Sequence, residues 1–184
     1  MDRQEALDYM LENVKNSNLR KHILAVEAVM RRLATRLGED PEKWGLAGLL
    51  HDIDYETTKD SPDRHSLVGA EMLESAGVEP DIVEAVRAHN DCHGLERETK
   101  MAKALYAADP LTGLIVAAVL ISPAKKLAGI DAQFVLNRFG EKAFARGARR
   151  EPMLGAKAEL GLDLDEFVAL GLEAMQGISG DLGL

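Results

Sequence analysis

The chain has 184 residues, 46% of them hydrophobic and 29% charged, which is the composition of a globular protein long enough to bury a sizeable core in one domain, residues 1–184. A formal net charge of −9 argues against an extended nucleic-acid-binding surface, although it leaves room for a local basic pocket. The longest strongly apolar run, Leu111 to Ile121, is shorter than the roughly 20 residues of a membrane span, and no basic-then-apolar leader opens the chain. Cys92 is the only cysteine, which suits a reducing compartment. We therefore expect a cytoplasmic protein without a membrane contact.

The first part of the chain is predicted to be helical, because apolar residues recur at spacings of three and four and no sustained alternation appears. Three helices are expected here, each with a polar cap or a proline in its first turn. They are a helix over residues 3–15 capped by Asp2, a helix from Asn18 to about Leu37 that ends at Gly38, and a helix from Pro41 to the pair His51-Asp52.

The rest of the chain follows the same pattern. The expected helices cover residues 63–77 (capped by Asp63 and ended by Gly77), 80–89, about 99–108, a segment that Asp109-Pro110 opens and "LTGLIVAAVL" continues, shorter helices after Pro123, and an amphipathic helix near 163–177. The run rich in Val and Ile resembles a strand in composition, but its alanines and its cap-plus-proline start favour a helix. The predicted fold class is therefore all-α.

Four of the five histidines lie on apolar helix faces, because residues three, four and seven positions apart share a face. These are His22, His51, His65 and His89. One such histidine is more often a core residue bonded to an ordinary neighbour. Four on separate helices each need a polar partner, and a shared metal ion would satisfy all of them. The fifth, His93, follows in a polar loop, where we expect it to be exposed; it is an additional candidate ligand or substrate contact.

Three acidic residues accompany these histidines. Asp52 follows an apolar helix with no charged side chain in residues 44–50, and a carboxylate there is costly to desolvate unless it is paired or coordinated. The alternative is that Asp52 accepts backbone N–H groups in the turn after its helix. Asp109 precedes Pro110, so it is a helix cap, a metal ligand or both. Asp54, two residues beyond Asp52, either supports the metal ligands from behind or faces solvent, and we expect the latter.

The order of these histidines and aspartates resembles the HD superfamily of metal-dependent phosphohydrolases, which is named after its His-Asp pair. The residues that carry the resemblance are His22, the pair His51-Asp52, and Asp109. The resemblance covers roughly residues 18 to 115. It implies an HD-domain-like helical bundle in which these four residues bind one divalent metal ion, with a C-terminal helical extension of about residues 122–184 packed on that core.

His65 and His89 lie between the pair and the last aspartate, as in binuclear members such as the HD-GYP cyclic-dinucleotide phosphodiesterases and the bacterial diadenosine-tetraphosphate hydrolases. That resemblance implies a second metal ion bound by His65 and His89, with Asp52 as the catalytic residue that bridges both ions. The chain lacks the Gly-Tyr-Pro signature and has "HDID" where HD-GYP members continue with glycine and lysine, so a cyclic dinucleotide is not expected. "HDIDYE" and "RHSLVGAEML" look closer to small stand-alone HD-domain proteins.

Nitrogen and carboxylate ligands without thiolates suit iron, manganese, zinc or similar divalent ions, and two such ions activate water for attack on a phosphoryl group. A phosphate substrate also needs cations, and residues 122–150 are rich in them: Lys125, Lys126, Arg138, Lys142, Arg146, Arg149 and Arg150 stand against Asp131 and Glu141. One interpretation is a solvated basic face. Another is a substrate-binding rim made of Lys59, Lys125, Lys126, Arg146, Arg149 and Arg150. The pair Arg149-Arg150 could equally bind a partner.

The function we expect is metal-dependent hydrolysis of a nucleotide or another small phosphorylated metabolite. Two alternatives remain open. Some HD-fold proteins, such as myo-inositol oxygenase, use the same ligand set to hold two irons that activate dioxygen, and a regulatory module would bind nucleotide without turnover. The amphipathic tail that starts at Asp163 is expected to cover either the core or a partner in a homodimer.

Overall fold

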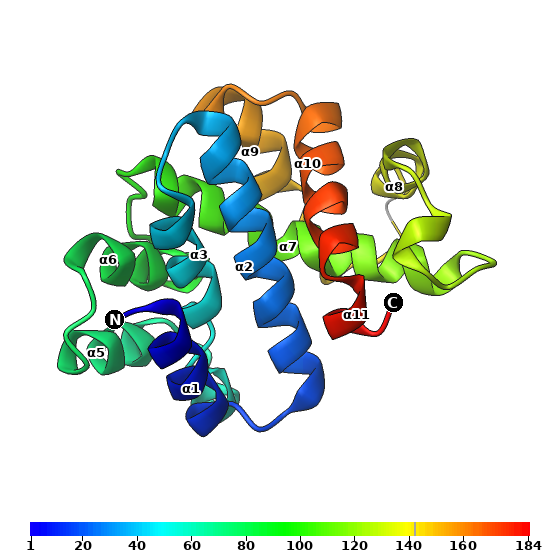
Figure 1. Ribbon diagram of the computed structural model, residues 1–184. Coiled ribbons are helices and arrows are strands. Elements are labelled where there is room, and N and C mark those ends of the chain that lie inside the picture. The colour runs from blue at the N-terminus through cyan, green and yellow to red at the C-terminus, as the bar shows by residue number, and fades with distance from the viewer. Residues whose placement is uncertain (142) are drawn as a thin grey trace.

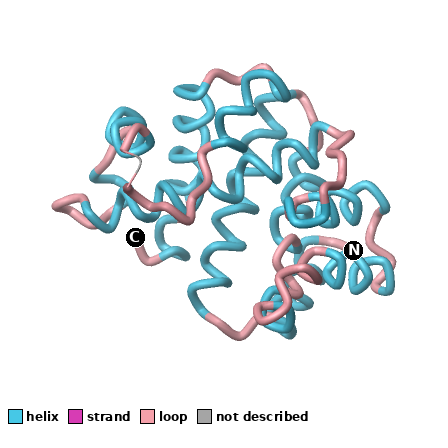
Figure 2. Tube along the Cα trace, turned by 180° about the vertical axis from the view of Figure 1, so that it is seen from behind, coloured by secondary structure: helices cyan, strands magenta, loops and turns pink. Residues whose placement is uncertain are grey.

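The computed structural model describes residues 1–141 and 143–184, and within these ranges the chain is helical and has no strand (Figures 1 and 2). The helices in chain order are α1 (Arg3–Asn13), α2 (Ser17–Leu37), α3 (Pro41–Leu50), α4 (Tyr55–Thr58), α5 (Leu67–Ser75), α6 (Pro80–Ala88), α7 (Lys100–Ile121), α8 (Ala132–Phe139), α9 (Glu151–Leu160), α10 (Leu164–Gly177) and α11 (Ser179–Leu182). Two single turns of 3₁₀-helix lie at Asp91–His93 and Leu127–Gly129. The all-α prediction is confirmed.

Two long helices, α2 and α7, form the centre of the molecule, and the others pack around them (Figure 1). α3 packs along α2, α6 lies against both α3 and α7, and α9 and α10 cover the opposite part of α7. The short C-terminal helix α11 returns to α2. The buried apolar side chains form one continuous cluster that extends from Ala6 to Leu182. The site described below therefore rests on helices that share a common core.

Most helix starts follow the local rules used for their prediction. Asp2 caps α1 in a capping box with Glu5, in which each residue accepts a hydrogen bond from the other's backbone N–H. The predicted cap of α2 is wrong by two residues, because Asn16 is the residue whose side chain accepts the N–H groups of Asn18 and Leu19. α2 ends at Gly38, whose φ of +72° suits a left-handed stop.

The predicted start of the helix after Lys59 is also wrong. Asp63 lies in a turn, and α5 begins only at Leu67, after Ser66. Ser66 has a φ of +73°, a backbone conformation that costs free energy for a residue with a Cβ. Hydrogen bonds with residues distant in the sequence hold Ser66 in this conformation, and a local cap rule does not take them into account. These bonds involve residues of the candidate site.

A single helix, α7, replaces the two helices predicted on either side of Asp109. Pro110 lies inside it and lacks the N–H that would bond the carbonyl of Tyr106, yet the helix continues because most of its length is buried in the core. Asp109 is thus an interior residue and not an N-cap. By length and composition α7 alone could cross a bilayer, but 61% of that window is buried inside the protein, which is the pattern of a central core helix.

The closest approach of α2 and α3 depends on Gly48. A Cβ at this position would lie 2.8 Å from the Cα of Glu27, which is backbone and cannot move aside. We expect Gly48→Ala to lower the free energy of unfolding by about 1–3 kcal/mol, as overpacking does in a tight core. Urea denaturation measures the effect, and Gly155→Ala is the control because a Cβ there meets no described atom within 4 Å. Equal stability of the two variants would contradict the close packing of α2 on α3.

Candidate metal centre

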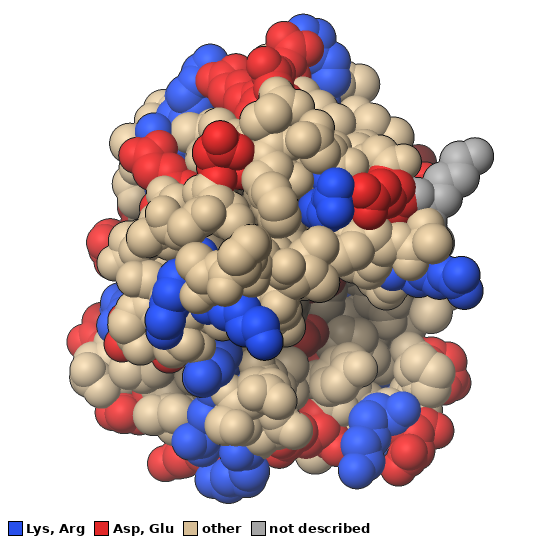
Figure 3. Space-filling view, turned by 90° about the vertical axis from the view of Figure 1, so that its right-hand side faces the viewer, with Lys and Arg blue, Asp and Glu red and all other residues tan. Residues whose placement is uncertain are grey.

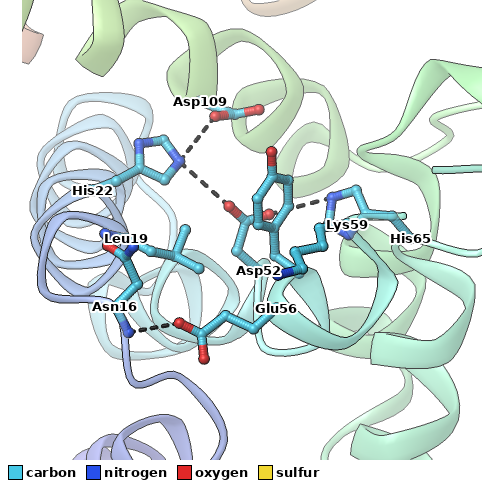
Figure 4. A pocket seen from close by; sticks show the side chains of 9 residues that line it. Asn16, Leu19, His22, Asp52, Glu56, Lys59, His65 and Asp109 are labelled. Atoms are coloured by element: carbon cyan, nitrogen blue, oxygen red, sulfur yellow. Dashed lines mark hydrogen bonds and ion pairs between the residues drawn. The ribbon is translucent and has the colours of Figure 1, made fainter. Parts of the chain in front are cut away.

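The six predicted ligand residues come together from five separate parts of the fold. They are His22 in α2, His51 at the C-terminal end of α3, Asp52 in the turn that follows, His65 in the turn before α5, His89 at the end of α6, and Asp109 within α7. Figure 4 shows four of them, with His22 and Asp109 on one side of Asp52 and His65 on the other. Residues that are 87 positions apart, such as His22 and Asp109, are thus neighbours in space.

Asp52 lies at the middle of this cluster, and its two oxygens face different pairs of histidines. Oδ2 is 3.6 Å from Nε2 of His22 and 3.4 Å from Nε2 of His51. Oδ1 is 3.3 Å from Nε2 of His65 and 3.5 Å from Nε2 of His89. One carboxylate therefore belongs to two groups of donor atoms, each compact enough to surround one ion. We refer to them as the His22/His51 group and the His65/His89 group, with Asp52 shared.

Asp109 completes the first of these groups. Its Oδ1 lies 3.1 Å from Nε2 of His22, on the face of α7 that looks toward α2 (Figure 4). Thr112, one turn later on α7, donates its hydroxyl proton to the carbonyl oxygen of Asp109 and accepts from Nδ1 of His22. The same turn of α7 thus supplies a carboxylate to the centre and fixes the orientation of a histidine on the neighbouring helix. No pattern in the sequence pointed to this role of Thr112.

All four histidines use Nδ1 for a bond to the protein, which leaves Nε2 directed at the centre. The partner is the hydroxyl of Thr112 for His22, and the Nδ1 of the other three lies close to a backbone or carboxylate oxygen: Gly48 at 2.9 Å for His51, Asp54 at 2.9 Å for His65 and Val86 at 2.6 Å for His89. A histidine that donates its Nδ1 proton in this way presents the Nε2 lone pair to a metal ion. The four rings are therefore oriented as metal ligands are.

Two further observations show that these residues fit a cation. Nε2 of His51 is buried and has no hydrogen-bond partner among the described residues, an arrangement that is costly for a polar atom. Nε2 of His65 and Nε2 of His89 lie 3.2 Å apart. Two lone pairs at this distance repel each other unless a proton or a metal ion lies between or beside them. Imidazole and carboxylate donors suit iron, manganese or zinc.

The charges of the cluster also favour a cation. Burial opposes the ionisation of Asp52, but the neighbouring His51 and the other histidines hold its pKa well below the usual value. Burial likewise opposes the ionisation of Asp109, and the hydrogen bond with His22 keeps its pKa low. Both carboxylates are therefore negatively charged at neutral pH. Two negative charges in one site, one buried and one partly buried, require positive charge beside them.

Without a metal ion, protons supply part of that positive charge. Burial lowers the pKa of His51, so its imidazole is neutral and is ready to act as a ligand. Burial also lowers the pKa of His65, but hydrogen bonds with Asp52 and Asp54 outweigh it and raise the value to about 10. His65 is accordingly protonated at neutral pH in the metal-free protein. Metal binding by His65 releases this proton, because the ligand must be deprotonated.

Asp54, which the sequence analysis expected to face solvent, is fully buried, so that expectation is wrong. Its Oδ1 accepts a hydrogen bond from Nδ1 of His65 at 2.9 Å, and its Oδ2 accepts from the N–H groups of Ser66 at 2.9 Å and Gly69 at 3.0 Å. The left-handed conformation of Ser66 aims its N–H at this carboxylate. Asp54 thus fixes both the ring of His65 and the start of α5.

We expect Asp54→Ala to weaken metal binding by the His65/His89 group about 10- to 100-fold, the usual cost of removing the residue that orients a metal-binding histidine. The His22/His51 group makes no contact with Asp54 in the described structure and should retain its ion. Metal titration followed by elemental analysis measures both affinities. Thr58→Val is the matched control, because it removes a hydroxyl bond to the carbonyl of Asp54 and leaves its carboxylate in place. Equal affinities in Asp54→Ala and the control would contradict this role.

The centre lies at one side of a pocket of about 790 Å³ (Figure 4). His22, Asp52, His65 and Asp109 line it, whereas His51 and His89 lie deeper and are buried. The remaining lining residues are Asn16, Leu19, Tyr55, Glu56 and Lys59. A ligand in this pocket thus has direct access to the shared carboxylate. Of the predicted basic rim, Lys59 is the residue that lines the pocket.

The other predicted basic residues have different surroundings. Arg149 pairs with Asp91, and its guanidinium lies over the ring of Tyr106. The exposed side chains of Lys125, Lys126 and Arg146 do not line this pocket, and Lys142 lies outside the described residues. The face of the molecule in Figure 3 is hollowed, with acidic side chains inside the hollow and Lys and Arg side chains on parts of its rim.

Arg150 holds a loop in place. Its guanidinium donates to the backbone carbonyls of Phe139, Phe144, Ala145 and Ala148. Residues 145, 147 and 148 of this loop border His22 and Asp109 on the side away from Lys59. The structure therefore places Arg150 in support of a wall of the centre, where the sequence suggested a contact with substrate.

His93 lies outside the cluster. Its ring is partly buried, and Nε2 donates to the carbonyl oxygen of His65 at 2.7 Å. The expectation of an exposed His93 is thus wrong, and this bond supports the turn that carries His65. Cys92, its neighbour, is exposed and also lies outside both groups of donor atoms.

The chain matches a protein-family model and several curated relatives. The model of the HD domain matches residues 19–118. Ribonuclease Y of Alkaliphilus metalliredigens is 32% identical over 171 residues, which cover 90% of this chain and 35% of that protein. Ribonuclease Y of Sulfurovum sp. is 33% identical over 73% of this chain and 26% of that protein, and that of Nitratidesulfovibrio vulgaris strain DP4 is 34% identical over 53% and 18%. The chain thus spans only about a fifth to a third of these relatives' length.

Proposed function

Since the chain belongs to the HD-domain family of metal-dependent phosphohydrolases, we propose that it hydrolyses a phosphoester bond of a nucleotide with water activated by two divalent metal ions. The family assignment agrees with the resemblance carried by His22, His51-Asp52 and Asp109. The observation that carries the proposal is the convergence of four Nε2 atoms and two carboxylates beside an open pocket.

The roles of the chain's own residues follow from their positions. His22, His51 and Asp109 would hold one ion, His65 and His89 the other, and Asp52 both. Ions held there supply a nucleophilic water and neutralise charge on the phosphoryl group. Lys59, which is exposed at the edge of the pocket, is placed to contact a phosphate oxygen. The bond of Asp54 to His65 keeps one ligand ring from turning away when substrate binds.

A second candidate substrate is RNA. The relatives named Ribonuclease Y favour it, because one of them matches 90% of this chain. A net charge of −9 favours a small nucleotide or the end of a strand over a long nucleic acid, whose phosphates would meet a mostly acidic surface. A single centre can act on both substrates, since each has a phosphate ester attached to a nucleoside, a diester within RNA and a monoester or diester in a small nucleotide. We therefore place the small nucleotide first and short RNA second.

The test begins with elemental analysis of the purified protein. It continues with a screen of nucleoside phosphates, dinucleotides, p-nitrophenyl phosphate esters and short RNA in the presence of the metal found. We expect about two metal ions per chain and release of phosphate or nucleotide that a chelator abolishes. A di-iron centre that consumes dioxygen and releases no phosphate would instead support an oxygenase. Nucleotide binding without turnover in the fully loaded protein would support a regulatory module.

A further inference from the structure

Tyr55 is an aromatic side chain that the proposed metal chemistry does not use. It lines the pocket beside the centre and is 46% exposed. Among the large hydrophobic side chains exposed in the described part of the chain, it is the only aromatic one, whereas Trp44 is buried in the core. An exposed ring at the wall of a pocket is a surface on which a flat ligand can stack.

The position of Tyr55 is fixed by the metal-binding turn. Its N–H donates to the carbonyl oxygen of Asp52 at 3.1 Å, and the residue before it is the buried Asp54. The ring meets His65 edge to face, with centroids 5.3 Å apart and planes at 89°. Because its backbone is bonded to the backbone of Asp52 and its ring packs on a ligand histidine, the stacking surface has a set position relative to the centre. Such a surface costs little conformational entropy when a ligand binds.

The wall across the pocket comes from the start of α2. Figure 4 shows Asn16 and Leu19 on this side, with Asp52 and Lys59 across from them. The carboxylate of Glu56 connects the two walls, because Oε1 accepts the N–H of Asn16 at 2.6 Å and Oε2 accepts the N–H of Lys15 at 2.8 Å. The width of the pocket is therefore set by hydrogen bonds between α4 and the turn before α2.

We propose that Tyr55 and Leu19 bind the nucleobase of the substrate, and this inference rests on the proposed function for the phosphate end. Each base offers a flat face to an aromatic ring, and the centre beside Tyr55 takes the phosphate of the same ligand. Lys59 lines the same pocket, and its ammonium group would pair with negative charge on the part of the ligand between the base and the metal centre. The subsite serves a nucleotide and the terminal nucleotide of an RNA equally, because both present a base one ribose away from the phosphate.

The experiment measures binding to protein loaded with manganese, and any probe that the loaded protein hydrolyses is replaced by its non-hydrolysable phosphonate analogue. The probes are the four nucleoside 5′-monophosphates and ribose 5-phosphate, which has the same phosphate and sugar without a base. Calorimetry of the wild-type protein should give dissociation constants about 10- to 100-fold lower for the nucleotides than for ribose 5-phosphate. Tyr55→Ala should abolish most of this difference by weakening the nucleotides alone, whereas Tyr55→Phe should retain it.

Leu19→Ala should reduce the preference for nucleotides in the same direction, and Leu154→Ala, an exposed apolar residue of α9 outside the pocket, should not. Equal binding of nucleotides and ribose 5-phosphate by the wild-type protein would overturn the inference, and so would a full preference in Tyr55→Ala. Failure of the proposed function would be seen separately, as loaded protein that binds these probes but hydrolyses no phosphoester. Metal content of Tyr55→Ala, measured in parallel, shows whether the centre itself is intact.

Discussion

Replacing Asp52 with asparagine is expected to abolish phosphoester hydrolysis, with a loss of at least about 10³-fold, and to release the metal ions at the same time. The reason is the shared position of its carboxylate, since each oxygen faces one group of histidines. Asparagine preserves the shape but removes the negative charge, and its amide nitrogen would donate where a metal ion must bind. Both groups are affected by one substitution. The measurements are kcat/KM for the best phosphoester and metal content by elemental analysis.

The matched control for this experiment is Asp60→Asn. Asp60 is an exposed carboxylate just after α4, in the same part of the chain, and is not among the pocket-lining residues. It removes the same charge from the protein while leaving the centre unchanged, and we expect wild-type metal content and turnover. Asp52→Asn protein that keeps both ions would show that Asp52 is no shared ligand. Asp52→Asn protein that keeps its activity would refute the proposed function of the centre.

The sequence predicts the fold class and the inward direction of the histidines for a simple physical reason. A helix of 3.6 residues per turn places His22 and His51 on faces that must be buried, so their direction is a local property. Which buried faces meet each other is a tertiary property, and periodicity does not contain it. The order of residues shared with the HD family supplied that information, and the six predicted ligand residues do lie together.

Local rules failed where tertiary contacts determine the conformation. Asp54 was expected to face solvent, but its carboxylate accepts the N–H groups of Ser66 and Gly69, twelve and fifteen residues later in the chain. Asp109 was expected to start a helix because Asp-Pro is a good cap, but burial of α7 continues the helix through the proline. Both departures lie beside the centre. The strained backbone of Ser66 and the proline inside α7 each cost free energy of folding. Favourable contacts elsewhere in the fold offset this cost.

Removing one histidine from either group should remove one ion and leave the other. We expect His65→Ala to bind about one metal ion per chain and to lose about 10²-fold in turnover, since one of two ions that stabilise charge on the phosphoryl group is missing. His22→Ala should lose the ion of the His22/His51 group and show a comparable loss of turnover. The two variants differ in which group stays complete: the His22/His51 group with Asp52 in His65→Ala, and the His65/His89 group with Asp52 in His22→Ala. Elemental analysis and a metal titration of each variant measure the stoichiometry.

The control is Cys92→Ala, because the side chain of Cys92 is exposed and belongs to neither group. It should keep both ions and most of the activity. If His65→Ala and His22→Ala both retained two ions, the two-group arrangement would be wrong. If His65→Ala lost both ions together, the two groups would form one cooperative site, held by Asp52, in which neither ion binds without the other. The first outcome refutes the ligands assigned to the two ions, whereas the second preserves them and changes only the order in which the pair of ions binds.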